Sequence, residues 1–169
     1  PNDASMWSKT NISNTIQIWN PTSGNYTTWN GSFGSAGTGH LALGQGFFVQ
    51  ASGANPSLSV LQGVRLHSEV SFKSTQEVED IISLTVTGNN YTDECFIIYR
   101  SDASDSFDFQ YDAVKFPGLP EAPQLYSKKI DNGTEINLAV NSINNIEMLA
   151  GKLIYLEVGE TTQYTLNFE

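Results

Sequence analysis

The sequence predicts an all-β fold, a two-sheet antiparallel β-sandwich of the jelly-roll or Greek-key kind. Many short segments alternate apolar and polar residues at a period of two, and clusters of Gly, Pro, Asn and Asp separate them at close spacing. No segment sustains the 3.6-residue periodicity of an amphipathic helix. The 169 residues are enough to bury a core as one domain, 1–169, in which residues 1–62 are the candidate for a hairpin-rich N-terminal subdomain.

The N-terminal strands are predicted from alternation and turn residues. Residues 15–19 place Ile16 and Ile18 on one face of a strand, and residues 25–30 return as its hairpin partner across the Asn20–Gly24 turn. Shorter strands are predicted at 47–51 and 56–61, each entered through a turn, and a transition strand is predicted over 65–72.

The C-terminal two-thirds should supply the main sheet. Segments 80–88 and 92–101 are predicted to pair as antiparallel neighbours at its centre. Asp131-Asn132-Gly133 is the strongest hairpin signal in the chain, and residues 143–150 suit either a short helix or a strand with a turn. The remaining strand candidates follow the three prolines 117, 120 and 123, and they are residues 124–130, 135–140, 152–158 and 163–168.

Charge and composition exclude several classes of partner. With 8 Lys plus Arg against 18 Asp plus Glu, the net charge is −10, which disfavours nucleic acid and anionic membranes. No run approaches the ~18 apolar residues of a membrane span, so we expect no membrane insertion. Cys95 is the only cysteine, and its place in an apolar strand predicts a buried, inert thiol. Because the chain begins at Pro1, we expect a piece of a longer exported precursor.

Several short motifs resemble a module of large bacterial proteins exported by the type IX secretion pathway. Residues 16–30 and 43–49 resemble its pattern I-x-x-W-D/N, then Y, then G-Q-G-F-F-V. Residues 107–115 resemble its F-D-x-x-Y-D-A-x-K piece, 123–127 its P-Q-L-Y-S/T piece, and 164–166 its Y-T-L end. The resemblance extends from Asn14 to Phe168, although each motif is short.

This resemblance implies a β-sandwich near the C-terminal end of a secreted or outer-surface protein. In such proteins a further β-rich domain and a sorting signal often follow the module, and most of these modules have no assigned function. No sorting domain follows Glu169, which is what truncation before that domain would give. The resemblance therefore predicts a compartment, secreted or on the outer cell surface, and an architecture, with neighbouring domains of the same precursor as partners.

Four aspartates form the first candidate site, and they are Asp102, Asp105, Asp108 and Asp112. A hard cation such as Ca²⁺ takes six to eight oxygen ligands, which closely spaced carboxylates and free carbonyls can provide. The EF-hand spacing is absent, so a structural Ca²⁺ is one hypothesis. The other is that these aspartates form turns by accepting hydrogen bonds from backbone amides. No other cofactor is predicted.

Three aromatic residues in the first hairpin, Trp19, Tyr26 and Trp29, form the second candidate site. Carbohydrate-binding sandwiches place flat aromatic faces against sugar C–H groups, which makes a polysaccharide a candidate partner. The alternative is that the rings pack into the core, where each buries a large apolar area. Binding requires exposed rings coplanar with a neighbour.

Catalysis has the least support, and no catalytic residue is assigned. A glycoside hydrolase needs two carboxylates facing each other across a cleft, which any chain with 18 acids can supply on paper. No Gly-x-Ser-x-Gly elbow occurs, and His40 and His67 have no metal-ligand spacing. We therefore expect a non-catalytic accessory or spacer module. A carbohydrate-binding module is the first alternative, and a hydrolase is the second.

Overall fold

The computed structural model describes residues 7–37, 39–64, 80–160 and 163–169, and the structural statements below concern these residues. The all-β prediction is confirmed, because the described segments contain strands β1 to β12, two 3₁₀ helices and no α-helix. Within the same residues, no helix is long and apolar enough to cross a membrane. The strand predicted over 65–72 lies outside the described residues.

Residues before position 62 form two small antiparallel sheets. Strand β1 (Trp7–Thr10) pairs with β5 (Ser57–Val60). Strand β2 (Ile12–Asn20) lies between β3 (Asn25–Trp29) and β4 (Phe48–Ala51). The predicted β2–β3 hairpin is confirmed, with Ile16 opposite Trp29 and Trp19 opposite Tyr26.

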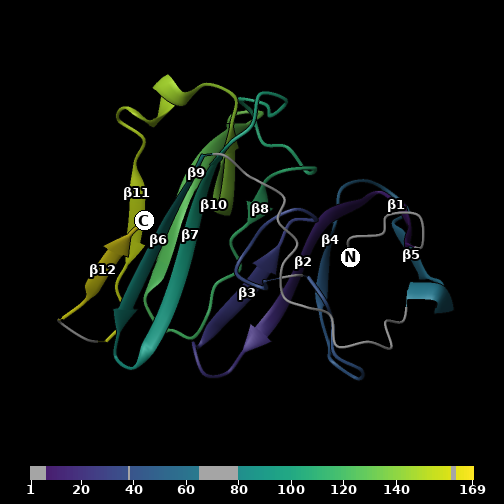
Figure 1. The fold of residues 1–169 in the computed structure, drawn as a ribbon, viewed down its shortest axis with the longest axis horizontal. Coiled ribbons are helices and arrows are strands. Elements are labelled where there is room, and N and C mark those ends of the chain that lie inside the picture. Colours follow the sequence, from purple (N-terminus) through teal and green to yellow (C-terminus); the bar gives the residue numbers. More distant parts are fainter. Residues whose placement is uncertain (1–6, 38, 65–79, 161–162) are drawn as a thin grey trace.

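The main sheet contains seven strands and follows the order β11-β9-β10-β7-β6-β12, with β8 paired to β10. The strand bounds are β6 (Ile81–Gly88), β7 (Tyr91–Tyr99), β8 (Ala113–Val114), β9 (Gln124–Asp131), β10 (Thr134–Ile143), β11 (Ile154–Glu157) and β12 (Thr165–Phe168). Between β10 and β11 the chain forms η3 (Ile146–Leu149), the helical turn that the sequence offered as one of two alternatives, and η2 is Gln62–Val64. The small sheets lie beside the main sheet, and β12 and β1 are at opposite ends of the long axis (Figure 1).

The main sheet is a curled, mixed half-barrel with two small sheets beside it, and the described residues do not form a clear two-sheet sandwich. Leu84 and Val86 of β6 pack in one cluster with Leu125 of β9, and Ile154 of β11 lies against it, although β6 is not adjacent to β9 or β11 in the sheet. The prediction that all pairing is antiparallel is wrong at one place, where β7 and β10 run parallel. Alternation along a strand indicates which face is buried, but not the direction of a partner forty residues away.

Strand β7 is covered on both faces, which explains its continuous apolar run. Cys95 belongs to the cluster inside the curl, whereas Phe96 and Ile98 belong to a second cluster with Val140. Phe33, from the loop that follows β3, packs edge-on against Phe96 with ring centroids 5.0 Å apart. The small three-stranded sheet and its loop therefore cover the outer side of the main sheet.

The Asp131-Asn132-Gly133 turn joins β9 to β10 as predicted, with Thr134 opposite Asp131. Asn132 and Gly133 both have positive φ, 48° and 80°, as a type I′ turn requires. The turn twists with the strands and sets their register, because a two-residue loop leaves no slack.

Truncation of Leu125 should destabilise the fold because this side chain is 1% exposed inside the curl. We expect Leu125→Ala to lower the free energy of unfolding by about 2–5 kcal/mol, as buried leucines do when a cavity replaces them. Leu153→Ala is the matched control, since Leu153 is 64% exposed, and it should stay within ~0.5 kcal/mol of the parent. Urea unfolding followed by circular dichroism measures both, and equal losses would contradict the assignment of the core.

Candidate functional site

The structure brings Trp19 and Tyr26 together but places Trp29 elsewhere. The first two rings lie 5.1 Å apart at 67°, across the hairpin, and Trp19 is 37% exposed. Trp29 is only 4% exposed and packs below Gly39, where a Cβ would come within 2.5 Å of its indole. Tyr26 and Trp29 are three residues apart in one strand, so they must point to opposite faces. Period-two reasoning could have separated them.

Two further aromatic rings join the exposed pair, and the sequence prediction missed both. Tyr26 contacts Phe48 of β4 and Phe116, each with ring centroids 5.6 Å apart, and Phe48 is 51% exposed. All of these contacts are edge-to-face, with interplanar angles from 67° to 86°. We call Trp19, Tyr26, Phe48 and Phe116 the aromatic patch. Trp19 and Phe48 are exposed, Tyr26 and Phe116 are half-buried, and the rings are not coplanar.

The four predicted metal ligands lie in different environments. Asp102 is exposed, and its carboxylate accepts hydrogen bonds from Arg100 and from the Tyr111 hydroxyl. These two partners hold the pKa of Asp102 below its usual value, with the Tyr111 bond the larger cause. Asp105 lies in a groove at the end of the main sheet, and Asp108 accepts the backbone N–H of Gln110.

Asp112 is buried in an ion pair with Lys129 of β9. Lys129 Nζ lies 2.9 and 3.1 Å from the two carboxylate oxygens. The Asp112 side chain is 0% exposed and the Lys129 side chain 2%. The carboxylate also accepts the backbone N–H groups of Asp108 and Ser142, each at 2.8 Å. Burial raises the pKa of Asp112, although Lys129 and the two N–H groups act in the opposite direction.

Asp108 and Asp112 thus accept backbone hydrogen bonds, as the turn-forming alternative describes. Across the described part of the chain, no group of three or more His, Cys, Asp or Glu side chains could hold a metal ion. Asp112 already uses both of its oxygens for Lys129 and two backbone amides. The four aspartates are therefore neighbours in sequence without a common centre.

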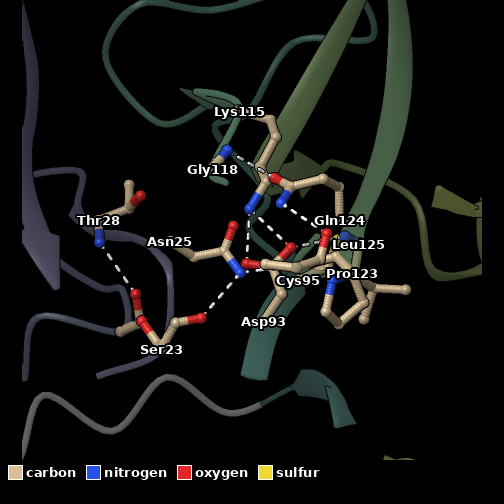
Figure 2. Close-up of polar contacts among 12 residues, drawn as sticks. Ser23, Asn25, Thr28, Asp93, Cys95, Lys115, Gly118, Pro123, Gln124 and Leu125 are labelled. Atoms are coloured by element: carbon tan, nitrogen blue, oxygen red, sulfur yellow. Dashed lines mark hydrogen bonds and ion pairs between the residues drawn. The ribbon is translucent and has the colours of Figure 1, made fainter. Parts of the chain in front are cut away.

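A second buried ion pair lies between the small three-stranded sheet and the main sheet (Figure 2). Lys115 Nζ contacts both oxygens of Asp93 in β7 at 2.5 and 2.6 Å, and the two side chains are 5% and 3% exposed. Asp93 also accepts the backbone N–H of Leu125. Burial raises the pKa of Asp93 against the opposing effect of Lys115. Lys115 is the last residue of the 107–115 motif, but no pattern in the sequence pointed to its pairing with Asp93, which belongs to no motif.

Asn25 completes this region, which we call the junction and define by Asn25, Asp93 and Lys115. The Asn25 amide nitrogen donates to the carbonyls of Thr92 and Pro123, 3.0 and 3.3 Å away, and also to that of Ser23. Its side-chain oxygen is buried and has no hydrogen-bond partner among the described residues. Leaving a buried polar atom unpaired costs about 1–3 kcal/mol, so its position calls for an explanation.

The groove beside Lys129 has a volume of about 440 Å³. Its charged lining residues are Asp105, Lys128, Lys129, Glu135 and Lys152. Glu135 is bound by Lys128 at 2.8 Å, and Lys129 by Asp112. Any hydrolytic pair in this groove would have to use Asp105 and a paired Glu135.

Comparison of the chain with family models, with curated proteins and with solved structures gives no match. The fold and the junction define an all-β protein in which a small sheet is fixed to a curled main sheet through buried polar contacts.

Lys129→Met should destabilise the protein because it leaves the Asp112 carboxylate buried and unpaired. Breaking such a pair costs about 3–5 kcal/mol, and Asp112→Asn added to it should restore part of the loss by removing the charge while keeping an acceptor. Lys128→Met is the control, since it breaks the exposed pair with Glu135 and should change little.

The free energy of unfolding that Lys129→Met loses should also depend on pH, and it should be smaller in acid. Without Lys129 the folded pKa of Asp112 rises further above its unfolded value, so the folded state binds the proton more tightly. The free energy of unfolding of this variant is then greatest below the pKa that Asp112 has in the unfolded chain. It falls as the pH rises through the pKa that Asp112 has in the folded chain. The deficit of Lys129→Met should be smaller near pH 4 than near pH 7 in urea unfolding. A deficit that grows in acid would show that Asp112 is not buried alone.

Cys95 should be inert in the folded protein. Burial raises the pKa of its thiol to about 11, and its sulfur faces the Leu138 carbonyl at 3.7 Å. Because only the thiolate reacts, iodoacetamide at about pH 8 should leave the native chain unlabelled and label it fully in urea. Mass spectrometry reports the label, and rapid labelling of the native chain would show that the inside of the curl opens to solvent.

Proposed function

We propose that this chain is a non-catalytic spacer, an accessory module of an exported multidomain bacterial protein located in the medium or on the outer cell surface. The observation that carries the proposal is geometric. Strands β1 and β12 lie at opposite ends of the long axis (Figure 1), so structures attached near them would be held apart by the length of the molecule.

A spacer must be stiff along that axis, and a set of polar contacts between the two sheets supports stiffness. Side chains of β2 and of Asn30, the residue after β3, donate to backbone carbonyls of residues 111–114, which include β8. Gln17 donates to Val114, Thr15 to Asp112, and Asn30 to Tyr111. Hydrogen bonds are directional, so several of them in a row resist sliding as well as separation. The expected partners are neighbouring domains of the same precursor.

Double electron–electron resonance tests the required stiffness. Spin labels at Ser8→Cys and Asn167→Cys report the distance from β1 to β12, and Cys95 can remain because it is buried. Labels at Thr134→Cys and Asn167→Cys stay within the main sheet and give the matched control. We expect one narrow distance peak, no wider across the molecule than within the sheet. A broad or double peak across the molecule alone would refute a rigid spacer.

Carbohydrate binding is the second candidate, and the exposure of Trp19 and Phe48 favours it. Here Trp19 and Tyr26 would contact a polysaccharide, while Trp29 would support them from the core side. Titration of oligosaccharides against tryptophan fluorescence tests this function. Binding that Trp19→Ala abolishes would favour carbohydrate binding over the spacer.

A hydrolase would need Asp105 and Glu135 of the groove, and Glu135→Gln would then abolish turnover.

A further inference from the structure

The junction combines an amine, an amide and a carboxyl group in a place that water does not reach. The side chains of Lys115 and Asp93 are 5% and 3% exposed, and Asn25 is 1% exposed. Figure 2 shows the Asn25 amide directed toward the Lys115 amine and the Asp93 carboxylate. These are the functional groups that amide exchange requires: a nucleophile, an acyl carbon and an acid–base group.

The backbone holds Asn25 close to the segment that carries Lys115. The Leu119 N–H donates to the Gly24 carbonyl at 2.8 Å, which ties this segment to the start of β3. A Cβ at Gly118 would fall 2.0 Å from the Asn25 side-chain oxygen, so glycine is required for the approach. On the other side, Asn25 donates to the carbonyl of Thr92, the residue before Asp93.

The hydrogen bonding at the junction leaves the Asn25 oxygen without a partner in the described part of the chain, while the Asn25 nitrogen is held by three backbone carbonyls. Within the described residues, the Asn25 oxygen has no partner, and the Lys115 amine contacts only the two oxygens of Asp93. The ammonium has three N–H donors, so one is left over beside an unpaired acceptor. Noncovalent pairing therefore leaves the site incomplete.

We propose that Lys115 and Asn25 join in an intramolecular amide bond, a covalent link between β3 and the segment that follows β8. Asp93 takes a proton from the Lys115 ammonium, and the neutral Nζ attacks Cγ of Asn25. The Nζ–Cγ bond forms and the Cγ–Nδ2 bond breaks. Asp93 passes the protons lost by Nζ to Nδ2, which leaves as ammonium, and Asp93 ends as a carboxylate. No oxidant or other reactant is needed.

The surroundings favour each step. Burial raises the pKa of Asp93, which lets this carboxyl group hold a proton between its two transfers. Holding the amine beside the amide replaces an encounter in solution, and such positioning is worth several orders of magnitude in rate. Exclusion of water removes the hydrolytic side reaction.

Intact-mass spectrometry of the folded wild-type chain tests the bond directly. Loss of ammonia lowers the mass by about 17 Da relative to the sequence. Protease digestion should then yield one branched peptide that contains both Asn25 and Lys115. The full sequence mass, with the two residues in separate unmodified peptides, would overturn the proposal.

Succinimide formation at Asn132-Gly133 would give the same mass loss, so the position of the change decides. A succinimide takes up water in mild alkali and ends as aspartate or isoaspartate, about 1 Da above the sequence mass, whereas an amide between side chains persists. A mass loss confined to Asn132, or one that alkali reverses, would count against the link.

Two variants assign the roles of the residues. Lys115→Arg keeps a cation for Asp93 but cannot form the amide, and Asp93→Asn removes the acid–base group; both should show the full mass. Lys128→Arg is the matched control on an exposed face and should retain the mass loss. Retained loss in Lys115→Arg would overturn the assignment. The mass result and the spacer test can fail separately. A rigid molecule with the full sequence mass would refute only the bond. A bonded molecule with a broad distance distribution would refute only the spacer.

Discussion

The arrangement of this protein depends on one carboxylate, that of Asp112. It lies at the centre of the segment between β7 and β9, and it joins Lys129 of β9 to the backbone of Ser142 in β10. The same carboxylate accepts the N–H of Asp108 and so shapes the preceding turn. The carbonyls of Tyr111, Asp112 and Val114 then receive the side chains of the small sheet. If Asp112 moved, the surface on which β2 and β3 rest would move with it.

The energetic role of such a pair is specificity more than net stability. Removing two ions from water costs several kcal/mol each, and their attraction recovers this only when the remaining donors and acceptors are satisfied. Here Lys129 also donates to the carbonyls of Ser104 and Ser142, at 2.8 and 2.6 Å. An apolar pair of equal volume could give the same free energy of unfolding, but apolar contacts would allow residues 102–112 to lie in several positions. The directional hydrogen bonds of the ion pair allow one position.

Local parts of this fold could be predicted from the sequence, and distant pairings could not. The turn at Asn132-Gly133 and the β2–β3 hairpin depend on adjacent residues, and both form as predicted. The parallel contact of β7 with β10 joins strands separated by two other strands and a long loop, which no local pattern encodes. Asp112 stood in the predicted acidic segment, but its partner Lys129 lies on another strand. Neither Asn25 nor Asp93 carried any signal.

The junction and the Asp112 pair solve the same physical problem in two places. Both bury a lysine and an aspartate where the small sheet and the main sheet meet the segment between β7 and β9. At Asp112 every polar atom of the pair has partners, so the noncovalent arrangement is complete. At Asp93 the donors and acceptors do not balance, because the Asn25 oxygen remains unpaired. Because the two ion pairs are otherwise similar, this difference is why we expect amide formation at the junction. At Asp112 we expect a purely structural ion pair.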